Sequence, residues 1–118
     1  MSKIADDIYN ILKESFPNYN IIKEYYIGYE NYRLFFDFFI KEFGAFIEVQ
    51  GRQHTCYVHH FHGCMDNFKA QKHRDNLKLK YIQSNKKLCL IRFYHDEVID
   101  KHLVLNKLYK ALEMGFYE

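Results

Sequence analysis

Three β-prone segments follow one another between residues 21 and 50, and they constrain the fold more than any other feature of the chain. They read IIKEYYIGY at 21–29, YRLFFDFFI at 32–40 and AFIEVQ at 45–50. Aromatic and β-branched residues of this kind favour strands. Only a few residues separate the segments, which leaves no room for a crossover, so neighbouring strands must run antiparallel. We therefore expect a three-stranded meander.

The rest of the chain predicts helices around one further strand. Apolar residues at helical spacing predict helices at 2–15, 66–84 and 99–114, and KLCLIRFY at 87–94 has the continuous apolar character of a buried strand. A strand that follows a long helix favours a crossover back into the same sheet. We expect one α/β domain over residues 1–118, a mixed central sheet flanked by helices in the order α-β-β-β-α-β-α.

Composition excludes several classes of protein. The chain has 118 residues and is 48% hydrophobic, which excludes a disordered chain. Its apolar runs are too short for a membrane helix of about 20 residues. The opening MSKIADD lacks the apolar core of a signal peptide, and three cysteines without such a signal favour a reducing compartment. We expect a cytoplasmic protein with no membrane partner.

Two acids lie inside strands that are otherwise apolar. Asp37 is in LFFDFFI and Glu48 is in AFIEVQ. A buried carboxylate is costly unless it is paired, hydrogen-bonded or bound to a metal. Antiparallel neighbours would bring the two acids together, and such an oxygen pair suits Mg²⁺. The alternative is that each acid simply faces outward on a half-exposed strand.

The segment RLFFDFFIKEFGAFIEVQGRQH resembles the core of PD-(D/E)XK nucleases, in particular the very-short-patch-repair-type branch and related small phage homing endonucleases. Downstream, FKAQKHRDNLKLKYIQSNKKLCLIRF is similar to the helix and following strand of that family. The resemblance covers about residues 21–98. It implies a restriction-endonuclease-like fold and a metal-dependent DNA endonuclease, encoded by a phage or mobile element.

The resemblance also implies roles for individual residues. Asp37 and Glu48 would be ligands of Mg²⁺ or Mn²⁺, and both would be catalytic. His54 would be a general acid or base or a phosphate contact, and Asp75 would orient His54 or a metal-bound water. The chain departs from the general pattern at Gln50, where most of the superfamily has lysine; Gln50 would contribute through its backbone carbonyl or amide.

Simpler interpretations remain open for His54, for Asp75 and for one further acid, Asp7. His54 is otherwise an ordinary loop histidine. Asp75 is otherwise part of a helix ion pair with Lys72 or Lys78. Asp7 on the first helix is a further candidate acid, expected to point towards the sheet; otherwise it is a favourable charge in the first turns.

A group of cysteines and histidines follows the third strand. Cys56, His62 and Cys64, with His95 as a fourth ligand, are candidates for a structural Zn²⁺ site. The alternative is a polar loop that contacts DNA or covers the edge of the sheet.

Basic residues are concentrated in the long helix. Residues 69–87 contain seven Lys and Arg against one Asp, a local balance of +6. Lys72, Arg74 and Lys78, with Arg92 on the next strand, are candidate phosphate contacts in DNA. The alternative is a solvated helix face. Across the chain, residues 1–50 have five basic and eight acidic side chains, whereas residues 51–118 have twelve and seven.

The sequence therefore predicts a metal-dependent endonuclease that nicks or cleaves DNA. Two alternatives stand beside it: a nuclease-fold protein that binds nucleic acid without cleaving it, and a zinc-stabilised adaptor. Because a domain this small has little surface for reading bases, we expect specificity to come from DNA shape, from a homodimer or from a phage or host partner protein.

Overall fold

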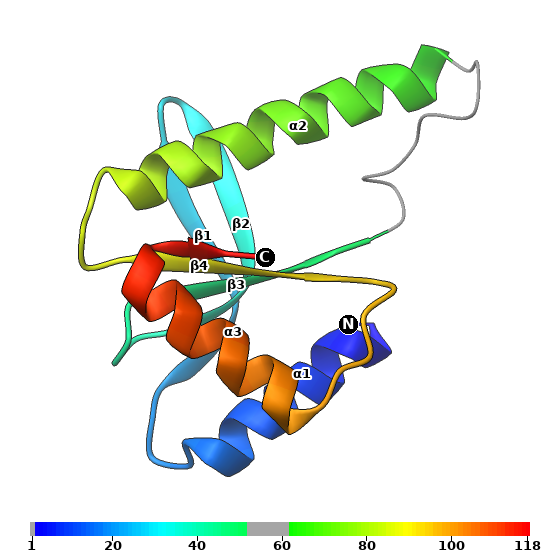
Figure 1. Ribbon diagram of the computed structural model, residues 1–118. Coiled ribbons are helices and arrows are strands. Elements are labelled where there is room, and N and C mark those ends of the chain that lie inside the picture. Colours follow the sequence, from blue (N-terminus) through cyan, green and yellow to red (C-terminus); the bar gives the residue numbers. More distant parts are fainter. Residues whose placement is uncertain (1, 52–61) are drawn as a thin grey trace.

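The computed structural model describes residues 2–51 and 62–118, with the backbone alone for residues 62–68 (Figure 1). The elements in chain order are α1 (Lys3–Ser15), β1 (Ile21–Tyr29), β2 (Tyr32–Ile40), β3 (Ala45–Gln50), α2 (His62–Gln83), β4 (Cys89–Tyr94), α3 (Lys101–Met114) and β5 (Phe116–Tyr117). The protein is an α/β structure with a five-stranded mixed sheet and three described helices, which confirms the predicted fold class.

The strands lie in the sheet in their chain order, β1-β2-β3-β4-β5. The pairs β1–β2 and β2–β3 are antiparallel, which confirms the meander. Strand β4 pairs parallel to β3 after α2 has crossed one face of the sheet, which confirms the crossover. The edge strand β5 pairs parallel to β4 and was not predicted, because two residues are too few to show a pattern.

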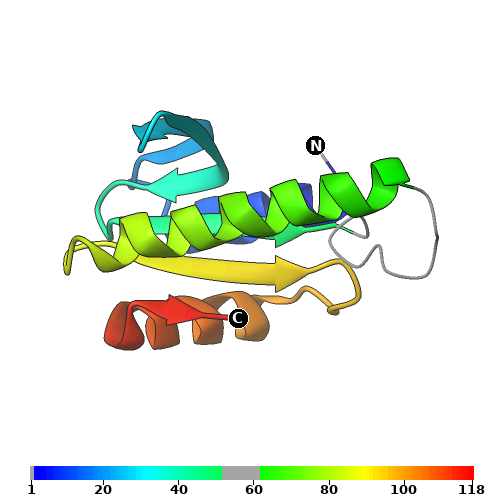
Figure 2. The ribbon, with the colours of Figure 1, turned by 90° about the horizontal axis from the view of Figure 1, so that it is seen from above.

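Helices cover both faces of the sheet, with α1 and α3 together on one face and α2 alone on the other (Figure 1). Residues Ile8 and Leu108 belong to the core beneath α1 and α3. Leu77 and Ile82 belong to a second core beneath α2. Seen from above, α2 lies across the sheet between the β1–β2 hairpin and β4 (Figure 2).

Local sequence explains most helix boundaries. Ser2 and Asp100 cap α1 and α3 by accepting bonds from Ala5 N and Leu103 N, as short polar side chains do at helix starts. Gly115 ends α3 in the left-handed conformation at φ 85°, where the absence of a Cβ avoids a penalty. The predicted start of α2 at residue 66 was too late: the helix begins at His62 and runs through Gly63, a weak helix former.

None of the helices in the described ranges combines the length and apolar character needed to span a bilayer.

Candidate active site

The face of β3 and β4 that lies beneath α2 changes from apolar to polar along the strands. Because parallel partners point to the same side, three cross-strand pairs form successive rungs: Phe46 with Leu90, Glu48 with Arg92, and Gln50 with Tyr94. The carboxyl ends of both strands therefore present polar groups at one edge of the sheet. In α/β sheets, the crevice beyond such carboxyl ends is where ligands commonly bind.

Strands β2 and β3 separate at Asp37. Their pairing stops at Phe38 and Ile47, and Asp37 Oδ2 instead accepts a 2.8 Å hydrogen bond from Val49 N. Strand β2 also rotates here, since Phe36 packs beneath α2 whereas Phe38 packs beneath α1 and α3. The separation opens space beside a carboxylate in the interior of the sheet.

The opposite strand is distorted at the same level. The β1–β2 register pairs Lys23 with Phe38 and Tyr25 with Phe36, so Glu24 lies opposite Asp37. Glu24 has φ 54°, in the left-handed region that residues other than Gly and Asn rarely adopt. The bend in the hairpin is therefore centred on the Glu24–Asp37 level.

Glu48 is enclosed by two cations. Lys78 Nζ from α2 donates to Glu48 Oε1, and Arg92 Nε from β4 lies 3.4 Å from Glu48 Oε2. All three side chains are buried, with residue exposures of 5–7%. Burial of a charged trio is tolerated only because each charge has an opposite partner and hydrogen bonds.

Burial acts on both strand acids. Desolvation raises the pKa of Asp37; the Val49 amide and Lys78 oppose this rise, and Glu24 adds to it. Desolvation also raises the pKa of Glu48, against the opposing effect of Lys78 and Arg92. A raised carboxyl pKa means that the ionised form is held at a cost, which a bound cation would relieve.

Two neighbouring pockets meet at Gln50. One, of about 220 Å³, is lined by Phe35, Asp37, Glu48, Val49, Gln50, Gln71 and Lys78. The other, of about 280 Å³, is lined by Gln50, Gly51, Lys72, Asp75, Arg92, Tyr94, His95 and Glu118. The predicted Asp37, Glu48 and Gln50 thus share the first pocket, and Asp75 and Arg92 lie in the second.

The α2 residues of the prediction divide into two groups. Asp75 is buried, accepts from Gln71 Nε2 at 3.2 Å, and its backbone carbonyl accepts from Arg92 Nη2 at 3.2 Å. Lys78 is also buried and contacts Glu48, so it does not lie on a solvated helix face. Lys72 and Arg74 are exposed, as a surface that contacts phosphates requires.

Several predicted residues lie elsewhere. Asp7 pairs with Lys3 at 2.9 Å on the exposed side of α1, so the expectation that it points towards the sheet is wrong. His54 and Cys56 lie outside the described residues, as do the side chains of His62 and Cys64, and the zinc prediction rests on them.

Sequence reasoning missed two contributors to the site. Lys78 was predicted only as a DNA backbone contact, and the structure shows that its ammonium donates to the second acid, Glu48. His95 was considered only as a zinc ligand, yet it lies in the pocket with Gln50 and Arg92, and its backbone N donates to Gln50 O at 3.1 Å. The parallel pairing of β3 and β4 brings His95, in the turn after β4, beside Gln50.

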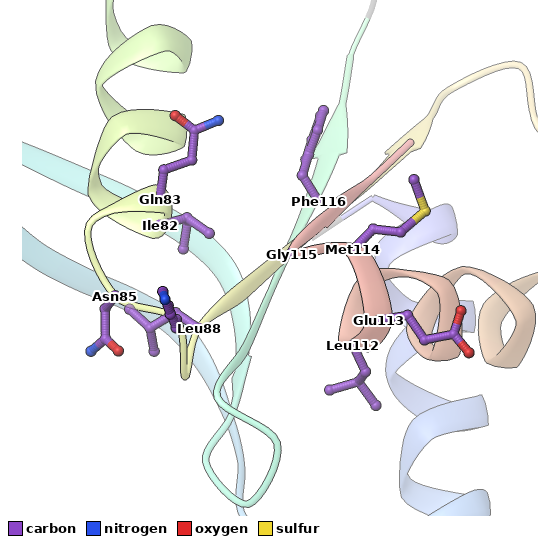
Figure 3. Close-up of a pocket in the computed structure, with 10 residues that line it drawn as sticks. Ile82, Gln83, Asn85, Leu88, Leu112, Glu113, Met114, Gly115 and Phe116 are labelled. Carbon is purple, nitrogen blue, oxygen red and sulfur yellow. The ribbon is translucent and has the colours of Figure 1, made fainter.

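A third cavity, of about 300 Å³, is separate from these acids. Figure 3 shows that its lining comes from the end of α2, the turn after it, the end of α3 and β5, with residues such as Ile82, Leu88, Leu112 and Phe116. Its lining includes one carboxylate, Glu113, and no histidine or cysteine. It therefore offers less chemistry than the pockets around Gln50.

The donor set around Asp37 fits a magnesium-like ion in its chemistry. Among the described side chains, no three His, Cys, Asp or Glu residues cluster tightly enough to hold a metal by themselves. Mg²⁺ commonly uses only one or two carboxylates, with waters and phosphate oxygens completing the shell. Asp37 and Glu48 are two carboxylates that line the same pocket.

Comparison with protein-family models, with curated proteins and with solved structures found no match to this chain.

Proposed function

We propose that the protein is a metal-dependent endodeoxyribonuclease with the PD-(D/E)XK arrangement. One observation carries the proposal: β2 and β3 separate so that Asp37 and Glu48 line one pocket together with the ammonium-bearing Lys78. Two carboxylates and a cation in a partly enclosed site are suited to phosphodiester hydrolysis, in which negative charge develops on the phosphate.

Each side chain has a role consistent with its position. Asp37 and Glu48 would hold Mg²⁺ or Mn²⁺, which when bound supplies a Lewis acid for the phosphate and lowers the pKa of water. Lys78, which pairs with Glu48, would neutralise charge on the phosphate. Arg92 and Lys72 line the neighbouring pocket, where they would bind an adjacent phosphate.

His95 supplies an imidazole within the described part of the site. It lies with Lys72, Asp75 and Arg92 in the second pocket. An imidazole can both donate and accept a proton, so His95 is a candidate to protonate the leaving oxygen, alongside the sequence candidate His54.

The test is nicking of supercoiled plasmid in Mg²⁺ or Mn²⁺. We expect the wild-type protein to relax the plasmid and Asp37→Asn to lose about 10³-fold or more in rate, because a ligand is lost while the side-chain shape is kept. The matched control is Asp96→Asn, an exposed carboxyl in the turn after β4, which should nick at the wild-type rate. Intact plasmid with every divalent ion would refute nuclease activity.

A second candidate is a protein of this fold that binds DNA without cleaving it. The enclosure of Glu48 by both Lys78 and Arg92 favours it, because those cations compete with a metal for the carboxylate. A gel shift of DNA by wild-type protein that never nicks would support this candidate.

A further inference from the structure

The half of the β1–β2 hairpin nearer its turn, beyond the Glu24–Asp37 level, has one face beneath α2 and an opposite face on which Tyr26 is exposed. Tyr25, Ile27 and Leu34 pack in the core beneath α2. The alternate residues Tyr26 and Phe35 are cross-strand partners on the opposite face. Tyr26 is 53% exposed, so its ring is accessible to a ligand.

Tyr26, Phe35 and Arg33 form an aromatic cluster in which the planes of the two rings are tilted by 50°. The rings of Tyr26 and Phe35 have centroids 5.1 Å apart, and the guanidinium of Arg33 lies 5.0 Å from the centroid of the Tyr26 ring. Neighbouring rings hold one another in place, and a cation over an aromatic face is itself attractive. Two flat apolar rings and a positive charge are thus presented together at the surface.

This aromatic cluster adjoins the proposed cleavage pocket through Phe35. Phe35 lines that pocket with Asp37, two residues further along β2. Alternate residues of a strand are about 7 Å apart, so Phe35 of the aromatic cluster lies close to the Asp37 carboxylate. A polymer with a phosphate at Asp37 would therefore place its next unit over Phe35 and Tyr26.

The chemistry of the surface selects the kind of polymer. Base faces stack on Tyr and Phe, and Arg adds both a cation–π contact and a phosphate contact. Base pairs within a duplex already stack on each other, so their faces are hidden. Unpaired bases are free to use such a surface.

We propose that Tyr26, Phe35 and Arg33 form a stacking platform for unpaired bases of a DNA strand whose phosphate lies in the Asp37 pocket. This inference rests on the proposed function and specifies its substrate: DNA that is single-stranded, or locally unpaired, beside the cleaved bond.

The test measures binding of a fluorescent single-stranded 20-mer and of the blunt duplex of the same sequence, by anisotropy in EDTA, so that no cleavage occurs. We expect Tyr26→Ala to weaken single-strand binding roughly 5- to 100-fold and duplex binding less than about twofold. Tyr26→Phe, which keeps the ring, should bind as wild type. Tyr109→Ala, which removes a 52% exposed ring on α3, is the matched control and should have no effect.

Three results would overturn the platform. In the first, Tyr26→Ala binds the single strand as tightly as Tyr109→Ala does. In the second, Tyr26→Ala weakens the binding of single-stranded and duplex DNA by the same factor, which indicates a contact with the DNA backbone only. In the third, Tyr26→Ala converts a dimer to a monomer in sedimentation, which identifies the face as an interface between copies.

The platform proposal and the nuclease proposal can be refuted independently of each other. Because the anisotropy measurement needs no divalent ion, an inactive protein can still show the Tyr26 effect. Conversely, normal plasmid nicking without any Tyr26 effect would refute the platform and leave the nuclease proposal standing.

Discussion

The two faces of the central sheet differ in the chemistry of their buried side chains. The core beneath α1 and α3 includes Ile8, Ile47 and Ile91, all buried and apolar. Beneath α2, the apolar contacts give way to Glu48, Gln50, Asp75, Lys78 and Arg92, which are five of the six buried polar or charged residues among those described.

Lys107, the sixth, is a buried charge on the face beneath α1 and α3, and its hydrogen bonds show its role. It comes from α3, and its Nζ donates to Arg92 O at 2.8 Å and to Glu97 Oε1 at 2.7 Å. Glu97 also accepts from Tyr94 N at 2.7 Å, so these bonds fix the turn that carries His95. A charge on this face supports the backbone, whereas the charges beneath α2 line open pockets.

This difference separates stability from function. A group of buried charges is weak evidence for stability, since apolar replacements of similar shape often stabilise a protein. Charges kept beside pockets of 220 and 280 Å³ point instead to chemistry. The comparison predicts that substitutions beneath α1 and α3 change stability but not the nicking rate per folded molecule, whereas substitutions of the charged residues beneath α2 change the nicking rate.

The largest effect on stability is expected beneath α1. Ile8→Ala should lower the free energy of unfolding by about 4 kcal/mol, because Ile8 is fully buried and its removal leaves a cavity. Urea titration measures the loss, and Ile8→Val, at about 1 kcal/mol, serves if the alanine variant does not fold. The nicking rate per folded molecule should not change. A 10-fold fall in that rate would contradict the assignment of stability to this face and of activity to the face beneath α2.

The next effect tests the buried charges beneath α2. Lys78→Met should cost about 3 kcal/mol of folding stability, since it removes one of the two cations that pair with the buried Glu48 and leaves Arg92. The double variant Glu48→Gln with Lys78→Met should cost less than the sum of the single changes, because the unpaired charge is gone. Additive costs in urea titrations would show that the pair is not coupled.

A smaller effect is expected from divalent ions. Mn²⁺ at about 100 times its dissociation constant should stabilise the folded protein by about 2.7 kcal/mol, because the ion binds only the folded site. A thermal melt with and without Mn²⁺ measures the shift. Asp37→Asn should abolish it and Asp96→Asn should retain it; equal shifts in both would place the ion elsewhere.

The smallest effect concerns pH without metal. Burial raises the pKa of Asp37 in the folded protein, so ionised Asp37 destabilises the fold, and its stability contribution is lost as the pH rises through the folded pKa. Asp37→Asn should therefore be more stable than wild type at pH 8. This advantage should vanish below the ordinary pKa of 3.8, as measured by urea titrations across pH. An advantage independent of pH would contradict the burial of this charge.

Much of the framework could be predicted because its signals are local. Short turns between 21 and 50 predicted the meander, and an aspartate or glutamate within each of two apolar strands identified Asp37 and Glu48. Local reasoning did not reveal that Lys78 is buried against Glu48, since a lysine on a basic helix looks the same whether its ammonium faces water or a carboxylate on a strand. It also failed at Asp7, whose helical position placed it on the apolar side although it pairs with Lys3 at the surface.

The amino-acid sequence by itself determined the elements, their order and the two strand acids, because periodicity, turn length and the cost of buried charge act over a few residues. The tertiary structure alone decided three things: the rotation of β2 at Asp37, the enclosure of Glu48 by Lys78 and Arg92, and the placement of His95 beside Gln50. The last two depend on the α2 crossover and the parallel pairing that follows it, which bring together residues about 30 to 45 positions apart that no local pattern connects.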